Sequence, residues 1–299
     1  MVNRTTQIPS WLRALYPFEP KNITTAGGAK LSYLDEGPRS DEAVLMLHGN
    51  PTWSFFYRDL VRSLSPGLRC IVPDHVGMGL SEKPEHYDYS LGTRIADIEA
   101  LVASLGLKRV HLIVHDWGGA IGFGFATKHP EMIGRIVILN TAAFFSMHIP
   151  KRIALCRVGV FGKLLVRGFN GFAGPASWMS TVRPLASEVK RGFLFPYDSW
   201  SNRVAVHRFV QDIPMSLSHP TRHALDEIEA KLPLLADREK MILWGGRDFC
   251  FNDHFLARWR EIFPQASVHR YADAGHYLLE DAGADALGRI SCFLQPKTP

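Results

Sequence analysis

Residues 114–119, Val-His-Asp-Trp-Gly-Gly, place one acidic side chain in a turn between an apolar run and a helical pattern. The apolar run is Val110–Val114, and small and apolar residues continue from Gly118. This arrangement is typical of a strand, a sharp turn and a helix that together expose a nucleophile. Asp116 stands at the position where Ser is usual, and a free Asp has a pKa near ~3.9. The carboxylate needs no base, so we predict that Asp116 attacks carbon and forms an ester on the enzyme rather than only capping the following helix.

Two residues further along the chain supply a base and an acid. Asp248 and His276 each follow a predicted strand, and they come in the order nucleophile, acid, histidine that suits this arrangement. We predict that His276 is the general base that activates water, and that Asp248 fixes its tautomer and stabilises the imidazolium. His75 is a weaker candidate for the base. Asp273 is an alternative acid, but it lies close in sequence to His276.

Two residues beside the nucleophile carry suitable hydrogen-bond donors. Asn50 lies in the loop after the predicted strand Ala43–Leu47, and Trp117 directly follows Asp116. Their backbone amides are in the positions expected of an oxyanion hole. The Asn amide and the indole N–H have no acid–base role, yet both can hold a halide ion. Such a donor stabilises a leaving group by roughly 3–4 kcal/mol, so we predict that Asn50 and Trp117 form a halide clamp.

Apolar runs that alternate with helical patterns would position these residues. Continuous apolar strands of this kind predict a mainly parallel sheet with helices on both faces, an α/β fold. The predicted strands are Ile23–Thr25, Lys30–Leu34, Ala43–Leu47, Arg69–Val72, Val110–Val114, Ile133–Leu139, Lys240–Leu243 and Ser267–Arg270. The predicted helices are Ser54–Leu64, Ser90–Leu105, Gly118–Lys128, Asp253–Ile262 and Asp285–Leu294.

The segment 143–235 differs from the rest, because it has many aromatic and basic residues and no clear buried strand. Helical periodicity is visible in Ser187–Leu194 and Asn202–Gln211. We therefore predict a core domain of residues 1–142 and 236–299, with residues 143–235 inserted as a helical cap over the carboxyl edge of the sheet, where ligands bind in open α/β sheets.

Composition limits the alternatives for this chain of 299 residues. It has no apolar run of 18 or more residues, and Met1–Pro9 lacks the apolar core of a secretory signal. Four scattered cysteines without metal-ligand spacing suggest free thiols, so we expect a cytoplasmic protein without a membrane span. The net charge of +5 comes from residues 150–235, where basic residues are spread among apolar ones, and we expect no nucleic acid partner.

The motifs His48–Trp53 and His115–Gly119 together resemble the haloalkane dehalogenase family, and the resemblance runs from Leu15 to His276. It implies an α/β-hydrolase fold with Asp116 as nucleophile, His276 as base, and Asn50 with Trp117 as halide clamp. In some branches of the family the catalytic acid follows the strand that ends here at Asn140, but an Asn side chain cannot act as an acid. Asp248 can, and this position of the acid makes the chain similar to the third subfamily. Members of that subfamily tend to self-associate, so the resemblance implies a possible homo-oligomer.

Three cap segments are also similar to β-lactone decarboxylases of long-chain olefin synthesis. They are Arg167–Asn170, Pro196–Trp200 and Arg208–Pro214. Those enzymes share the dehalogenase catalytic residues. In that reaction Asp116 would attack the lactone ring, and carbon dioxide and an alkene would leave.

Other classes fit the residues less well. Epoxide hydrolases need two cap tyrosines, and the predicted cap contains only Tyr197. Fluoroacetate dehalogenases carry arginines after the nucleophile, and Trp117–Ala120 offers none. A serine esterase would need Ser at position 116, and a complete set of nucleophile, acid and base gives little support to a non-enzymatic binding protein.

The prediction is therefore a haloalkane dehalogenase that needs no metal or organic cofactor. It would act through an alkyl-Asp116 ester on a small hydrophobic substrate, with halide ion and water as its other ligands. A β-lactone decarboxylase is the alternative.

Overall fold

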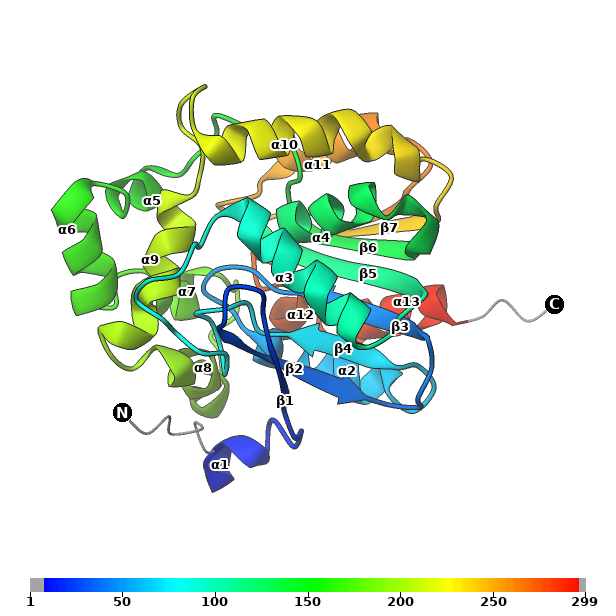
Figure 1. Cartoon of the computed structure of the whole chain (residues 1–299), viewed down its shortest axis with the longest axis horizontal. Coiled ribbons are helices and arrows are strands. Elements are labelled where there is room, and N and C mark those ends of the chain that lie inside the picture. The colour runs from blue at the N-terminus through cyan, green and yellow to red at the C-terminus, as the bar shows by residue number, and fades with distance from the viewer. Residues whose placement is uncertain (1–7, 296–299) are drawn as a thin grey trace.

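The computed structural model describes residues 8–295 and contains one eight-stranded sheet (Figure 1). Predictions for Met1–Gln7, including the lack of a secretory signal, and for residues 296–299 lie outside the described residues. The strand order is β1-β2-β4-β3-β5-β6-β7-β8, with β1 and β2 antiparallel to their neighbours and the others parallel. The strands are β1 (Lys21–Thr24), β2 (Lys30–Glu36), β3 (Glu42–Leu47), β4 (Cys70–Pro73), β5 (Arg109–Asp116), β6 (Ile133–Thr141), β7 (Lys240–Gly245) and β8 (Ser267–Tyr271).

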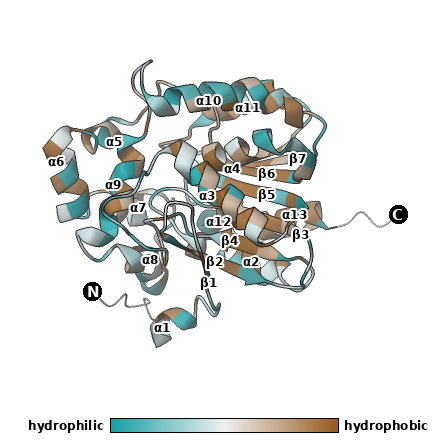
Figure 2. Cartoon of the chain, in the orientation of Figure 1, coloured by the Kyte–Doolittle hydropathy of each residue, from teal (hydrophilic) through white to brown (hydrophobic). Residues whose placement is uncertain are grey.

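Helices cover both faces of the sheet, which explains why the central strands are almost entirely apolar. In Figure 2 the strands are mostly brown, and teal is concentrated on the surrounding helices. On one face lie α2 (Arg58–Leu64), α12 (Leu278–Asp281) and α13 (Gly283–Leu294), and on the other α3 (Leu91–Ser104), α4 (Trp117–Lys128), α10 (Pro220–Lys231) and α11 (Asp253–Ile262). A short helix, α1 (Ser10–Arg13), precedes the sheet. The predicted α/β-hydrolase architecture is confirmed.

A group of short helices between β6 and β7 lies at the left of Figure 1, at one side of the sheet. These are α5 (Lys151–Leu155), α6 (Gly159–Lys163), α7 (Ala173–Met179), α8 (Ser187–Leu194) and α9 (Val204–Gln211). Helix α8 has the predicted bounds. Helix α9 follows a 3₁₀ turn, Ser201–Arg203, so the predicted helix Asn202–Gln211 begins with tighter geometry.

The structure differs from the predicted cap boundary at helix α10. This helix falls inside the range 143–235, yet it packs on α3 and α4 of the core. Gly124 of α4 makes room for both neighbouring helices, since a Cβ there would lie 2.3 Å from Ile95 of α3 and 3.2 Å from Ile228 of α10. The structure therefore places α10 with the core helices, and only the segment before it forms the roof.

Three observations test expectations that do not concern the fold itself. Within residues 8–295 no cluster of three or more His, Cys, Asp or Glu side chains is arranged to bind a metal ion. None of the helices in the described part of the chain is both long and apolar enough to cross a bilayer. All four cysteines are free thiols, as predicted.

Candidate active site

Asp116 occupies the sharp turn between β5 and α4 in an unusual backbone conformation. Its φ is 52° and its ψ is −129°, a region that side-chain-bearing residues rarely adopt. The start of α4 comes very close to the end of β3, because a Cβ on Gly118 would lie 1.9 Å from the carbonyl oxygen of Leu47. The hydroxyl of Thr141, at the end of β6, donates to the carbonyl oxygen of Asp116. The predicted turn is therefore present, and neighbouring strands hold it on both sides.

The carboxylate of Asp116 is buried and held by backbone donors. The amide of Asn50 donates to Oδ1 at 2.6 Å, and the neighbouring amide of Trp117 also favours the charged form of the carboxylate. Burial raises the pKa of Asp116, while the nearby charge of His276 and the two amides oppose the rise. Gly49 allows this approach, since a Cβ there would lie 1.9 Å from Oδ1. The two amides predicted for an oxyanion hole both point at the predicted nucleophile.

His276 links Asp116 to Asp248. Its Nδ1 donates to Oδ2 of Asp248 at 2.7 Å, and its Nε2 lies 3.6 Å from Oδ2 of Asp116. The other oxygen of Asp248 accepts from the amides of Cys250 and Phe251, at 2.6 and 3.1 Å. With Nδ1 bound to Asp248, the ring presents Nε2 toward the predicted nucleophile. The ring needs this orientation both to accept a proton at Nε2 and, when protonated, to face Asp116 as a cation.

The charge state of His276 depends on two opposing effects. Burial lowers the pKa of His276, but Asp248 and Asp116 raise it by more, so the pKa lies above the ordinary value of 6.5. Because the pKa of His276 is raised in the folded state, the attraction between the protonated ring and the two carboxylates stabilises the protein fully below pH 6.5. This stabilisation is lost as the pH rises through the pKa of the folded protein.

Asp248→Asn is therefore expected to lower the pKa of His276, because it removes the strongest contribution that raises it. An NMR titration of the imidazole, assigned with a His276→Phe variant, would measure the change. Asp273→Asn is the matched control, since Asp273 is exposed and pairs with Arg247 at 2.8 Å. An unchanged His276 titration in Asp248→Asn would show that Asp248 is not its partner.

Two further buried polar side chains near the predicted nucleophile have structural contacts. His115 is buried beside Phe56, and its Nε2 donates to the carbonyl oxygen of His276 at 2.8 Å. Asn140 accepts from the amide of Gly245 at 2.7 Å and donates to the carbonyl oxygen of that residue at 3.1 Å. The two side chains therefore support the loops that carry His276 and Asp248.

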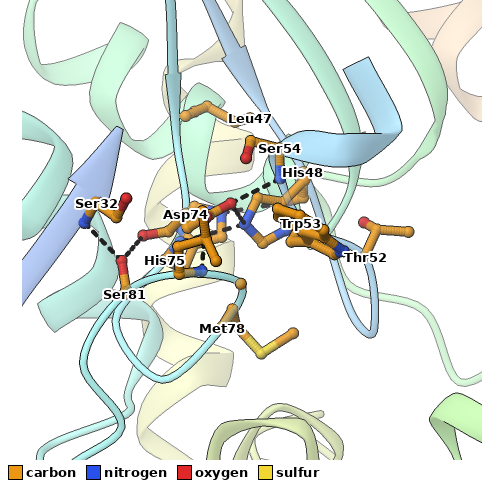
Figure 3. Close-up of polar contacts among 12 residues, drawn as sticks. Ser32, Leu47, His48, Thr52, Trp53, Ser54, Asp74, His75, Met78 and Ser81 are labelled. Atoms are coloured by element: carbon orange, nitrogen blue, oxygen red, sulfur yellow. Dashed lines mark hydrogen bonds and ion pairs between the residues drawn. The ribbon is translucent and has the colours of Figure 1, made fainter. Parts of the chain in front are cut away.

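His48 and His75 belong to a second buried cluster of polar contacts, which the sequence patterns did not reveal (Figure 3). His48 Nδ1 donates to the carbonyl oxygen of Gly49 at 2.8 Å, and its Nε2 accepts from the amide of His75 at 3.2 Å. His75 Nε2 donates to the carbonyl oxygen of His48 at 3.0 Å. Burial lowers the pKa of His48 to about 4 and also lowers that of His75, so both rings are neutral at pH 7. His75 thus holds the backbone of His48, two residues before Asn50, and its Nε2 is engaged in that hydrogen bond.

The side chains of the predicted halide clamp lie where the cap meets the core. Asn50 Nδ2 donates to the carbonyl oxygen of Val206, in α9, at 3.1 Å. Its Oδ1 is buried without a hydrogen-bond partner among the described residues. The ring of Trp117 packs on Phe209 of α9, with 5.5 Å between centroids. Asn50 and Trp117 both line the cavity beside Asp116. Because His276 lies 3.6 Å from Asp116 and 2.7 Å from Asp248, all five predicted site residues lie together.

The cavity under the cap has two lobes that meet at Asp116. The first, which we call the Trp117 lobe, has a cavity volume of about 120 Å³ and includes Trp117, Ala142, Phe144, Ile149, Ile213 and Leu225. The second, the His276 lobe, has a cavity volume of about 400 Å³ and includes His276, Cys156, Leu165, Ala176, Met179 and Phe249. Most of these side chains come from the cap, and the sequence patterns did not single them out.

The comparisons with known proteins identify the class. A family profile described as alpha/beta hydrolase fold matches residues 42–283. The chain belongs to the α/β-hydrolase fold family. A solved relative in shape is the haloalkane dehalogenase DatA from Agrobacterium tumefaciens C58, with a TM-score of 0.83 over 92% of this chain and 96% of that one. At 22% identity, this likeness supports the fold alone.

Curated relatives narrow the comparison further. The chain is 45% identical over 290 residues to a cis-3-alkyl-4-alkyloxetan-2-one decarboxylase of Shewanella oneidensis, covering 95% of this chain and 90% of that protein. A protein of the same name from Xanthomonas campestris is 45% identical over 291 residues, which cover 94% of this chain and 97% of that protein. Haloalkane dehalogenase 2 of Mycobacterium tuberculosis is 29% identical over 276 residues, which cover 90% and 92% of the two chains. The predicted resemblance to both groups is confirmed.

Proposed function

We propose that this protein decarboxylates β-lactones that carry alkyl groups on C3 and C4. The observation that carries the proposal is the 45% identity to decarboxylases of such lactones along nearly the whole chain. Identity to the dehalogenases is 29% over a similar length. The sequence motifs favoured a dehalogenase, but they cannot separate the two functions, because both reactions use the same predicted residues. The higher identity to the decarboxylases makes decarboxylation the preferred function.

The first step of the proposed reaction is a displacement at ring carbon C4. Asp116 attacks C4 and forms an ester, and the bond between C4 and the ring oxygen breaks. Its electron pair stays on the oxygen, so a carboxylate attached to C3 is released within the site. The side-chain N–H groups of Asn50 and Trp117 stabilise this carboxylate in the place predicted for a halide.

The second step releases both products without water. The bond between C3 and the carboxylate carbon breaks, and its electron pair forms the C3=C4 double bond. The bond between C4 and Asp116 breaks at the same time, and its pair returns to the Asp116 carboxylate. Carbon dioxide and an alkene leave. A protonated His276 stabilises the departing Asp116 carboxylate, which agrees with its raised pKa.

Haloalkane hydrolysis is the second candidate. The observation that favours it is the pair of Asn50 and Trp117 at the cavity wall beside Asp116. In that reaction a neutral His276 would take a proton from the water that cleaves the ester. An epoxide hydrolase has less support, because the hydroxyl of Tyr197 donates to the carbonyl oxygen of Thr52 at 2.9 Å and Tyr197 lines neither lobe.

A side-by-side assay tests the proposal. The purified protein is given a cis-3,4-dialkyl β-lactone, 1,2-dibromoethane or 1-bromohexane, and carbon dioxide, alkene and halide are measured. We expect equal amounts of alkene and carbon dioxide, with kcat/KM for the lactone at least about 100-fold above that for either bromide, a difference of roughly 2.7 kcal/mol. Halide release without carbon dioxide would favour the dehalogenase, and no product from any compound would favour a binding protein. Self-association and a cytoplasmic location remain predictions.

A further inference from the structure

The two lobes of the cavity share one wall segment around the predicted nucleophile. The residues that line both are Asn50, Asp116, Ile153, Phe172 and Cys250. Ile153 comes from α5, and Phe172 directly precedes α7. A molecule that reacts at Asp116 therefore sits where the lobes join, and two substituents of its reacting atoms can extend in separate directions.

Both lobes are lined in a way that suits hydrocarbon. Among the described residues that line the lobes, the ionisable ones besides two cysteines are Asp116, His148, Arg152 and His276. Burial raises the pKa of the two thiols, Cys156 and Cys250, so these are neutral as well. The cavity volumes of the two lobes, about 120 and 400 Å³, together fall within the range of a complete small-molecule pocket, which is about 300–1,000 Å³.

We propose that each lobe binds one of the two alkyl chains of the lactone, an inference that rests on the proposed function. The C3 chain lies in the Trp117 lobe and the C4 chain in the His276 lobe. The assignment follows from the leaving carboxylate, which is attached to C3 and is stabilised by Trp117. Trp117 lines only the first lobe. C4, which becomes bonded to Asp116, then faces the His276 side.

This arrangement also fixes which way round the ring binds. Exchange of the two chains between lobes would turn C3 away from Trp117 and place the departing carboxylate beside His276. The lobes therefore select the orientation in which Asp116 faces C4. A substrate with one long and one short chain reports on a single lobe, because only the long chain depends on the full depth of that lobe.

Two substitutions block the lobes one at a time. Ile213→Trp narrows the Trp117 lobe from the segment after α9, and Ala176→Trp narrows the His276 lobe from α7. Both positions are half-buried, so the larger side chain has room to adjust at the surface. Ala230→Trp is the matched control, since Ala230 is exposed on α10 and lines neither lobe.

The substrates are two synthetic cis β-lactones with exchanged chains, one with octyl on C3 and methyl on C4 and the other the reverse. Exclusion of a single methylene costs roughly fourfold in binding, so several methylenes amount to a large effect. We expect Ile213→Trp to lower kcat/KM at least 30-fold more for the 3-octyl isomer than for the 4-octyl isomer. Ala176→Trp is expected to show the opposite preference, and Ala230→Trp is expected to match the unaltered protein on both.

The outcomes separate the two proposals. If the unaltered protein decarboxylates neither isomer nor longer lactones, the proposed function fails. If it decarboxylates them and both variants lose the two isomers equally, the assignment of one chain to each lobe is wrong. If the preferences of the two variants are exchanged, the orientation of C3 toward Trp117 is wrong. Melting temperatures of the three variants exclude loss of folding as the cause.

Discussion

Asp116→Asn is expected to lose at least about 10⁴-fold in kcat on a dialkyl β-lactone, the scale seen when a covalent nucleophile is removed. The carboxamide keeps the size of the side chain, but its oxygen is a poor nucleophile and forms no stable ester with C4. Asn also tolerates positive φ better than most residues, so the backbone conformation at φ 52° can persist. Carbon dioxide and alkene release under multiple-turnover conditions would measure the loss.

Stability provides the control for this variant. Asp116 is a buried carboxylate whose pKa is raised by burial, so replacement by a neutral group is not expected to unfold the protein. We expect the free energy of unfolding to change by less than about 2 kcal/mol. A folded Asp116→Asn protein that retains more than a tenth of the activity would rule out Asp116 as the nucleophile.

His276→Phe is expected to separate the two candidate reactions, because only one of them needs water. With a β-lactone, the ester on Asp116 is resolved by loss of carbon dioxide, so alkene should accumulate well beyond one equivalent. The rate should fall by roughly 10²-fold, since the cation that stabilises the departing carboxylate is missing. With any bromoalkane that the unaltered protein accepts, halide should stop at one equivalent because no base remains to activate water.

Intact-mass spectrometry provides the second measurement for the same variant. After a bromoalkane is added, the protein should be heavier by one alkyl group on the peptide that contains Asp116. After a lactone is added, unmodified protein should be recovered once the substrate is consumed. A lactone reaction that stops at one equivalent in His276→Phe would mean that water resolves the ester, and the two-step decarboxylation proposed here would be wrong.

The core of the site was predictable because short stretches of sequence reveal both where a strand ends and which reactive residue follows it. Short, mostly apolar runs of three to seven residues located the strands, and Asp116, Asp248 and His276 each follow one of these runs. Parallel strands bring their carboxyl ends to one edge of the sheet, so these three residues meet without any knowledge of the loops. The 2.7 Å bond between His276 and Asp248 is the direct result.

The shape of the cavity was not predictable in the same way. Its lobes are formed by side chains such as Leu165, Ala176 and Ile213, which lie on short helices and turns that lack a clear period. The buried pair of His48 and His75 depends on contacts between residues 27 positions apart. The catalytic motifs also could not decide between decarboxylation and dehalogenation, since both reactions begin with attack by the same carboxylate.

The position of helix α10 has a practical consequence for exchanging caps between relatives. A chimera cut at residues 142 and 235 would replace α10 with a foreign helix, although α10 packs on α3 and α4 and its Ile228 lies close to Gly124. A cut just before Pro220 would instead keep this helix and the side chain of Ile228 with the sheet. The transplanted piece would then be the roof alone, which contains most of the walls of both lobes. Substrate range could in this way be moved from one scaffold to another while the core packing of the recipient stays intact.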